Sequence, residues 1–356
     1  MSIKINAFSL YKKIIKNYYN NNSFVVFRMP NDNKIFFYSH CKKYKIKKYS
    51  NFFFIQDFYN NFTIEIIPEK IYYIDIQYNT LYLLEKQEKN SHLIYNSYKY
   101  KKILENAIKH IIKIQSFEKV VLSRYIEIPF KNFSFKETFE KLIFSYPNTL
   151  TSIWYDVNFG IWIGSTPELL MKCVGKKIIT EALAGTINCL ESNKWTIKEI
   201  EEHNIVVKYI VFFFRKYYNY RGILNVENTQ SIKIGNLKHL KTVITFSFFK
   251  KPNFYKILKK LHPTPSICGY PKIKSLEYIK MNEKYNRSFY TGIIGIGNKK
   301  NMDMELYINL RCAKIITSKK IIFYAGSGVT AKSSVIKEYI ETENKIKSIL
   351  SKFFFR

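Results

Sequence analysis

Two segments of the chain place acidic side chains at intervals that would bring them onto one face of a helix. Glu338, Glu341 and Lys345 are spaced so that, at about 100° per residue, they fall within one narrow arc. Glu199 and Glu202 repeat the same spacing. Either pair could be an ordinary solvated helix face. Together they suggest a shared divalent cation with oxygen ligands, and Mg²⁺ is a better candidate than zinc because the histidines are few and not grouped.

A lysine and a glutamate stand beside apolar runs, where burial would shift their pKa values. Lys119 begins KVVLSRYIEI, a predicted strand, and Glu168 follows a proline and precedes two leucines. Burial would lower the pKa of the amine and raise the pKa of the carboxyl. Two plainer interpretations stay open: Lys119 as a lysine on an edge strand, and Glu168 as a glutamate in the first turn of a helix.

Small residues in two segments are suited to close contact with an anion. Gly326 and Gly328 follow a short predicted strand, Ile321 to Tyr324, and a loop there would bring bare backbone N–H groups near a ligand. The segment TEALAGT, which ends in Gly185 and Thr186, predicts the end of a strand at a corner of small residues.

Three further residues lie in segments with restrained or apolar surroundings. Arg311 lies in INLRCAKI, where a buried guanidinium needs an anionic partner, either within the fold or in a carboxylate ligand. Tyr290 lies in a second predicted strand, NRSFYTGIIGI. His262 lies in the proline-punctuated loop LHPTPSICGYPK, where a single histidine is usually a structural residue.

The composition predicts a globular cytoplasmic protein. A chain of 356 residues with 47% apolar content can bury a substantial core. Five scattered cysteines without a C-x-x-C pair indicate neither disulfides nor zinc. We expect no signal peptide and no membrane contact, since the apolar run at 209–214 is too short to span a bilayer. The net charge of +31 raises the question of nucleic acid, but the lysines are dispersed and accompany an AT-rich codon bias, so none is expected.

The predicted elements divide the chain at a soft boundary near residue 100. Residues 1–100 contain strand-like pieces at 24–28, 34–38, 52–55 and 72–76, but no chemistry that can be named. A helical period follows at 101–117, and further helices are predicted from residue 196 and from residue 335. Every candidate site residue lies in the second region, 101–356.

Nine motifs in chain order resemble those of the chorismate-binding enzymes, which include isochorismate synthase, salicylate synthase and the large subunits of anthranilate and aminodeoxychorismate synthases. The motifs are KVVLSR, GSTPELL, TEALAGT, KEIEEH, LHPTPSICGYP, NRSFYTG, ELYINLRCA, YAGSGV and EYIETENK, and they cover about residues 105–350. TEALAGT and LHPTPSICGYP are most similar to isochorismate synthase, which feeds menaquinone or catechol siderophore synthesis.

This resemblance implies an α+β fold with two large antiparallel β-sheets stacked as a sandwich and helices outside. Residues 1–100 would be a divergent part of the same fold, and a monomer is the default. The family implies Mg²⁺ on the ring carboxylate of chorismate, held by Glu202 and Glu341 with Glu199 and Glu338 in support. The implied substrate contacts are Gly185, Thr186, His262, Tyr290, Arg311, Gly326, Gly328 and Lys345.

The implied reaction adds water at C2 of chorismate and expels the C4 hydroxyl. By resemblance to the family, Lys119 is the general base that activates the water, and Glu168 is the general acid that protonates the leaving hydroxyl. Both must hold the less usual, uncharged form at neutral pH. The expected product is isochorismate, and menaquinone is its expected use.

Alternatives remain within and outside the family. Ala184 stands where one type of aminodeoxychorismate synthase has a nucleophilic lysine, which argues against a covalent route. Salicylate or anthranilate synthesis, a basic nucleic-acid-binding protein and an inactive scaffold remain alternatives. The chain also departs from the family, with a short stretch between Thr186 and Glu199, Asn286 in place of a common aspartate and Ser288 in place of a common glycine.

Overall fold

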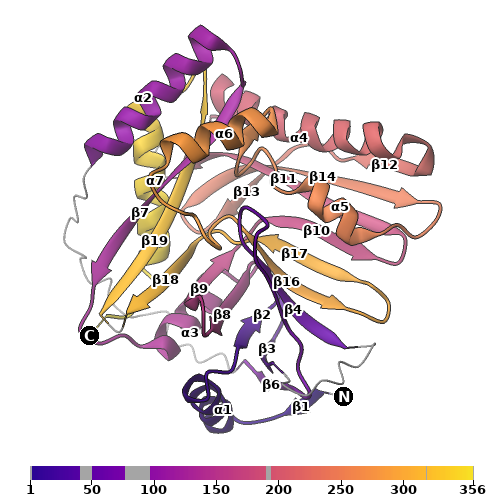
Figure 1. The fold of residues 1–356 in the computed structure, drawn as a ribbon, viewed down its shortest axis with the longest axis vertical. Coiled ribbons are helices and arrows are strands. Elements are labelled where there is room, and N and C mark those ends of the chain that lie inside the picture. Colours follow the sequence, from indigo (N-terminus) through magenta and orange to yellow (C-terminus); the bar gives the residue numbers. More distant parts are fainter. Residues whose placement is uncertain (1, 41–49, 77–96, 190–193, 318, 356) are drawn as a thin grey trace.

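The computed structural model describes residues 2–40, 50–76, 97–189, 194–317 and 319–355, within which two large β-sheets and seven α-helices form (Figure 1). The helices are α1 (Ala7–Tyr19), α2 (Ser97–Ile114), α3 (Phe135–Ser145), α4 (Ile197–Tyr218), α5 (Phe254–Leu261), α6 (Lys272–Asn282) and α7 (Val335–Leu350). Among the described residues, no helix combines the length and apolar character that a membrane span needs.

The first sheet has ten strands and the second has nine. The first runs in the order β1 (Ser2–Lys4), β6 (Ile71–Asp75), β3 (Lys34–Ser39), β2 (Phe24–Arg28), β8 (Leu150–Asp156), β9 (Gly160–Thr166), β18 (Cys312–Thr317), β19 (Lys320–Thr330), β7 (Lys119–Pro129) and β15 (Gly269–Tyr270). The second runs β12 (Gly222–Val226), β14 (Leu237–Phe248), β11 (Lys177–Asn188), β10 (Leu169–Val174), β17 (Met304–Ile308), β16 (Ile293–Asn298), β4 (Asn51–Gln56) and β5 (Thr63–Ile66), with β13 (Gln230–Ile234) paired to β14. Except for β1 with β6, neighbouring strands are antiparallel, as the α+β prediction requires.

Aromatic side chains fill the space between the two sheets. Trp154 and Trp162 of the first sheet stack with ring centroids 5.7 Å apart, and Phe289 meets both rings edge-on. Strand β2 is buried along its whole length because both of its faces are covered, so it reads as a continuous apolar run.

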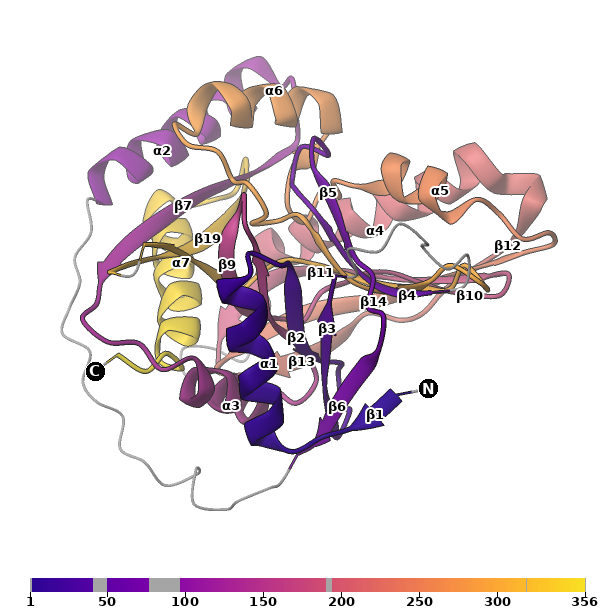
Figure 2. The ribbon, with the colours of Figure 1, turned by 60° about the horizontal axis from the view of Figure 1, so that its bottom comes forward.

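The helices cover the outer faces of the sandwich (Figures 1 and 2). α4 packs on β11 and β14 of the second sheet, and α7 packs on β19 of the first. The positions of these two helices matter most, because each carries one of the predicted Glu-x-x-Glu pairs.

The strands predicted in the first hundred residues are all present, and they belong to both sheets. β2 pairs with β8, and β4 pairs with β16, so this region is continuous with the rest of the sandwich. Helix α1 was not predicted.

Four local predictions were wrong. Gly326 and Gly328 lie within β19, not in a loop after it, because the strand continues to Thr330 in register with β7. Strand β11 does not end at TEALAGT but continues to Asn188 through a bulge, where Gly185 has φ +76°. Tyr290 and Arg311 lie in connections that precede β16 and follow β17, not within strands. Arg311 has φ +47°, so this turn is a strained backbone position.

Candidate functional site

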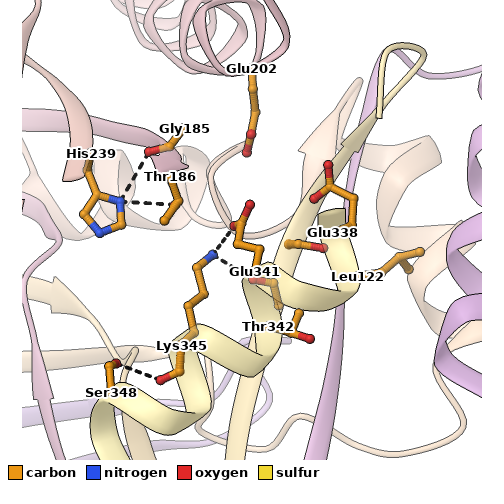
Figure 3. Close-up of polar contacts among 12 residues, drawn as sticks. Leu122, Gly185, Thr186, Glu202, His239, Glu338, Glu341, Thr342, Lys345 and Ser348 are labelled. Atoms are coloured by element: carbon orange, nitrogen blue, oxygen red, sulfur yellow. Dashed lines mark hydrogen bonds and ion pairs between the residues drawn. The ribbon is translucent and has the colours of Figure 1, made fainter. Parts of the chain in front are cut away.

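A cavity opens where α4 and α7 approach each other between the two sheets. Ten of the predicted site residues line it: Glu168, Gly185, Thr186, Glu202, Tyr290, Arg311, Gly326, Gly328, Glu341 and Lys345. Figure 3 shows Glu202 pointing from α4 toward Glu341 on α7, so the two acidic helices face one another across the same space.

Lys119 is fully buried at the start of β7 and is ion-paired to Glu202. Its Nζ lies 3.1 Å from Glu202 Oε1, and it makes no well-aligned hydrogen bond to a described residue. Burial lowers the pKa of Lys119, while the Glu202 carboxylate works against that shift. The interpretation of Lys119 as an exposed edge-strand lysine is therefore excluded by its complete burial.

A second buried lysine, Lys198, joins the carboxylates of the two helices. Its Nζ lies 2.9 Å from Glu202 Oε2 and 2.9 Å from Glu338 Oε1. Burial alone would raise the pKa of Glu202, but the ammonium groups of Lys119 and Lys198 outweigh it and hold that pKa below its usual range. Beside Glu202, His203 Nε2 lies 2.8 Å from Thr242 Oγ1 and fixes this turn of α4 to β14.

Glu341 and Lys345 form a pair on α7. Lys345 Nζ donates to Glu341 Oε1 at 2.6 Å and to the backbone carbonyl of Gly326 at 2.8 Å (Figure 3). Because N–H and C=O of one residue point to the same side of an extended strand, the Gly326 N–H also faces the cavity. The i, i+3 and i+7 spacing thus places Glu338, Glu341 and Lys345 on one face, as predicted.

Glu168 lies in the short connection between β9 and β10, so the interpretation as a helix first-turn residue is wrong. Its carboxyl is buried, and Ser266 Oγ lies 2.5 Å from Oε1. Burial raises the pKa of Glu168 to about 7, although the hydrogen bond from Ser266 and the charges of Lys119 and Lys345 oppose the shift. Near neutral pH a substantial fraction of this carboxyl is therefore protonated.

Arg311 and His239 also line the cavity and bring hydrogen-bond donors to it. Arg311 donates from one guanidinium nitrogen to Ser348 Oγ at 2.7 Å, and another lies 3.5 Å from His239 Nε2. His239 Nδ1 contacts the Gly185 carbonyl at 3.3 Å and Thr186 Oγ1 at 3.2 Å (Figure 3). Since a guanidinium can only donate, Nε2 is the acceptor and Nδ1 carries the proton. Burial lowers the pKa of His239 far below neutrality, so the ring is uncharged.

Gly328 has a steric role that the sequence did not indicate. A Cβ atom at this position would lie 2.1 Å from Glu202 Oε1 and 2.9 Å from Lys119 Cε. The absence of a side chain therefore lets the ion pair of Lys119 and Glu202 pack directly against β19.

Four predicted residues do not line the cavity. Lys119 is buried against Glu202, and Glu338 is linked to Glu202 through Lys198. The other two have structural roles. His262 is buried, its Nε2 lies 3.3 Å from the Phe58 carbonyl, and burial lowers the pKa of His262 to about 3, which fits a structural residue. The Glu199 carboxylate accepts hydrogen bonds from the backbone N–H and hydroxyl of Thr196, so it completes a capping box at the start of α4. Neither residue lines the cavity.

Three cavity-side residues were missed by the sequence reasoning. Lys198 directly precedes the predicted acidic pair, and its charge among glutamates was the available signal. Ser266 lies in the proline-punctuated loop that was noted for His262. His239 had no usable signal, because a single histidine in a strand does not indicate a site.

The carboxylates of the two helices suit a hard divalent cation, although lysines now neutralise them. No group of three His, Cys, Asp or Glu side chains in the described residues is close enough to form a ready-made metal centre. However, Glu338 Oε2 is buried without a hydrogen-bond partner, and Glu202 and Glu341 line the same cavity. A set of carboxylate oxygens with one unsatisfied atom fits Mg²⁺.

The arrangement can carry out acid–base chemistry on an anion. It offers the buried carboxyl of Glu168 on the cavity wall and the buried amine of Lys119 directly behind Glu202, with arginine, lysine and backbone donors to hold negative charge. Ala184 also lines this space, so no lysine at that position is available to attack a ligand.

Comparison with known proteins identifies relatives of this chain. Residues 61–353 match the family model described as Chorismate binding enzyme. Isochorismate synthase MenF of Haemophilus influenzae is 28% identical over 212 residues, 56% of this chain and 48% of that protein. The vibriobactin-specific isochorismate synthase of Vibrio cholerae is 27% identical over 53% of this chain and 50% of its own length. The chain thus spans about half the length of these curated relatives.

Solved structures share the fold. MenF, the menaquinone-specific isochorismate synthase from Escherichia coli, superposes with a TM-score of 0.74 at 19% identity, over 93% of this chain and 88% of that one. Anthranilate synthase component I from Streptococcus pneumoniae superposes with a TM-score of 0.67 at 17% identity, over 92% and 89%. At such low sequence identities the superposition shows a shared fold, and it confirms the predicted two-sheet α+β fold.

Proposed function

The chain belongs to the chorismate-binding enzyme family, and on this premise we propose that it is an isochorismate synthase. It would convert chorismate to isochorismate by adding water at C2 and expelling the C4 hydroxyl, with the ring double bonds shifting between the two positions. This is an isomerisation, because the water that enters balances the hydroxyl and proton that leave.

One observation carries the proposal: Glu168 is buried on the cavity wall, Lys119 is buried against the lining residue Glu202, and burial displaces the pKa values of the two groups in opposite directions. Lys119 would accept a proton from the attacking water; its Nζ is ion-paired with Glu202 but makes no hydrogen bond to a described residue. Glu168, with its pKa raised to about 7, would give its proton to the departing C4 hydroxyl.

Mg²⁺ is the proposed cofactor. Glu202 and Glu341 would hold it, with Glu338 in support through its unsatisfied Oε2. The bound ion would neutralise the ring carboxylate of chorismate. Glu199 is left out of this set because its carboxylate caps α4.

The second carboxylate of chorismate, on its enolpyruvyl group, would meet the hydrogen-bond donors around Arg311 on the cavity wall. Arg311 lacks a carboxylate partner among the described residues and is held by Ser348 and His239, so its remaining N–H groups are available. Tyr290 and the Gly326 N–H would add hydrogen bonds, and Lys345 would balance charge.

Water is the proposed nucleophile because Ala184 occupies the cavity wall at the position of the family's nucleophilic lysine. Salicylate synthase and anthranilate synthase are the alternatives within the family. Menaquinone as the final use stays a prediction, since the relatives include a MenF protein and a vibriobactin-specific enzyme. Cytoplasmic location and a monomeric state also stay predictions.

The test is to incubate the purified protein with chorismate and Mg²⁺, with and without ammonium, and to identify the product by mass spectrometry and fluorescence. We expect a product with the mass of chorismate and a retention time different from it. Salicylate or anthranilate, both of which have lost pyruvate, would assign the protein to another activity of the family. Salt-sensitive DNA binding without chorismate turnover would contradict the proposal altogether.

A further inference from the structure

Ser266 lies against the side chain of Glu168 on the cavity wall. Ser266 Oγ is 2.5 Å from Glu168 Oε1, and Thr264 Oγ1 is 2.7 Å from Ser266 Oγ. Ser266 and Glu168 both line the cavity, so this hydrogen bond lies where a ligand would bind.

The loop that carries Ser266 is held rigidly by a buried arginine. Arg287 donates to the Ile267 carbonyl at 2.8 Å and to the Val121 carbonyl of β7 at 2.7 Å, and it is paired with Glu283. The Thr264 carbonyl accepts from the N–H groups of residues 267 and 268. Because one guanidinium ties this loop to β7, which carries Lys119, the acid side and the base side of the cavity share an anchor.

The hydrogen-bond directions along this chain of hydroxyls follow from the number of protons. Each hydroxyl has one proton, so if Ser266 donates to Glu168 Oε1, Thr264 donates to Ser266. Oε1 of Glu168 is then an acceptor, and the proton of the neutral carboxyl lies on Oε2. Two hydroxyls in series also polarise each other, which strengthens the final bond to the carboxyl.

We propose that Ser266 is a positioning residue that fixes the carboxyl of Glu168 with Oε1 as acceptor and Oε2 as the oxygen that delivers the proton. This inference rests on the proposed function only in giving Glu168 the role of acid. When Oε2 releases its proton, Oε1 becomes a carboxylate oxygen that accepts more strongly from Ser266, so the same bond makes Glu168 a better acid.

Charged side chains from three other elements also shift the pKa of Glu168. Lys119 from β7 and Lys345 from α7 favour the carboxylate form, and Glu181 from β11 opposes it. None of these contacts changes when the Ser266 hydroxyl is removed. The loss of that single hydrogen bond should therefore raise the pKa of Glu168 further, because the ionised form loses a donor.

The test is a pH titration of the whole protein without chorismate, in which infrared spectroscopy follows the C=O stretch of the protonated Glu168 carboxyl. The Glu168→Gln variant, which lacks this carboxyl, assigns the band. We expect Ser266→Ala to raise the titration midpoint by roughly one pH unit, as a lost hydrogen bond to a charged group implies. Ser266→Thr, which keeps the hydroxyl, should return the titration midpoint to that of the unmodified protein. Ser165→Ala, which removes a buried hydroxyl bonded to Thr149 and Thr151, is the control and should leave it unchanged.

Turnover provides the second arm. With chorismate, Ser266→Ala should lower kcat about tenfold with little change in KM, and the alkaline limb of its pH profile should move upward with the infrared midpoint. An infrared midpoint that does not move in Ser266→Ala would overturn the inference, whatever the activity. Absence of turnover in the unmodified protein alongside a shifted midpoint would contradict the proposed function and leave the hydrogen bond to Glu168 established.

Discussion

Gly328→Ala is a single-methyl test of the ion pair at the centre of the site. The added Cβ would lie 2.1 Å from Glu202 Oε1, 2.7 Å from Glu202 Cδ and 2.9 Å from Lys119 Cε. To reach an ordinary contact of 3.4 Å, Glu202 Oε1 must retreat by more than 1 Å. Both neighbours belong to the proposed machinery, so the methyl group displaces the base and a cation ligand together.

The expected size of the effect differs between stability and catalysis. Inserting a methyl into a packed site costs about 1–3 kcal/mol of unfolding free energy. For a chain of this length that lowers Tm by only about 1–4 °C. A misplacement of about 1 Å among reacting groups can cost about a hundredfold in rate. We therefore expect a folded variant with kcat reduced at least a hundredfold.

The assay measures chorismate turnover and thermal unfolding side by side. Gly175→Ala is the matched control, because Gly175 has φ +59° and nothing lies within 4 Å of the position that a Cβ would take there. That variant should lose stability through backbone strain and keep its activity. If Gly328→Ala turned over chorismate at the rate of the unmodified protein, the inferred contact of β19 with Lys119 and Glu202 would be refuted.

Three other changes give distinct outcomes. Lys119→Ala and Glu168→Gln should each abolish turnover while chorismate binding, measured by calorimetry, stays nearly intact; ordinary activity in either would remove that residue from its role. Turnover of the unmodified protein should fall as pH rises through about 7, because Glu168 loses the proton it must donate; a rate that keeps rising there would contradict this. Lys198→Met should lower the unfolding free energy of the metal-free protein by about 3–5 kcal/mol in urea denaturation, because the buried carboxylates of Glu202 and Glu338 lose their shared partner. Mg²⁺ should restore part of the lost stability. Equal stability of the variant and the unmodified protein would show that Lys198 does not bridge the two carboxylates.

Helix periodicity predicted the acidic face of α7 correctly. The spacing of Glu338, Glu341 and Lys345 alone determines that they share a side of α7, because the geometry of a helix is local. The strands at 24–28 and 52–55 were also predictable, since continuous apolar runs of that length are typical of strands covered on both faces.

Backbone paths around glycine were not predictable in the same way. Glycine is typical of turns, so Gly326 and Gly328 suggested a loop. For Gly328 the reason is a tertiary contact, because Glu202 and Lys119 occupy the space that a side chain at residue 328 would fill. Such a contact between β19 and α4 is set by tertiary packing, which no local pattern reports.

The roles of Glu199 and His262 show the limit of motif transfer. A glutamate three residues after Thr196 is equally the signature of a capping box, and the structure uses it so. Lys198 was missed for the opposite reason, because a lysine on a helix normally lies in solvent. Here the carboxylates of Glu202 and Glu338 make its burial favourable. Ser288, in place of a common glycine, has φ +53°, which explains why glycine suits that position.

The most direct test of the proposed chemistry is the source of the oxygen at C2. Chorismate should be converted in water labelled with a heavy oxygen isotope, and the product should be analysed by mass spectrometry with fragmentation. We expect isochorismate that carries one solvent oxygen at C2 and has lost its original C4 hydroxyl. A product without solvent oxygen, or one formed by loss of pyruvate, would contradict the assignment of Lys119 and Glu168 as base and acid for the entry of water at C2 and the departure of the protonated C4 hydroxyl as water.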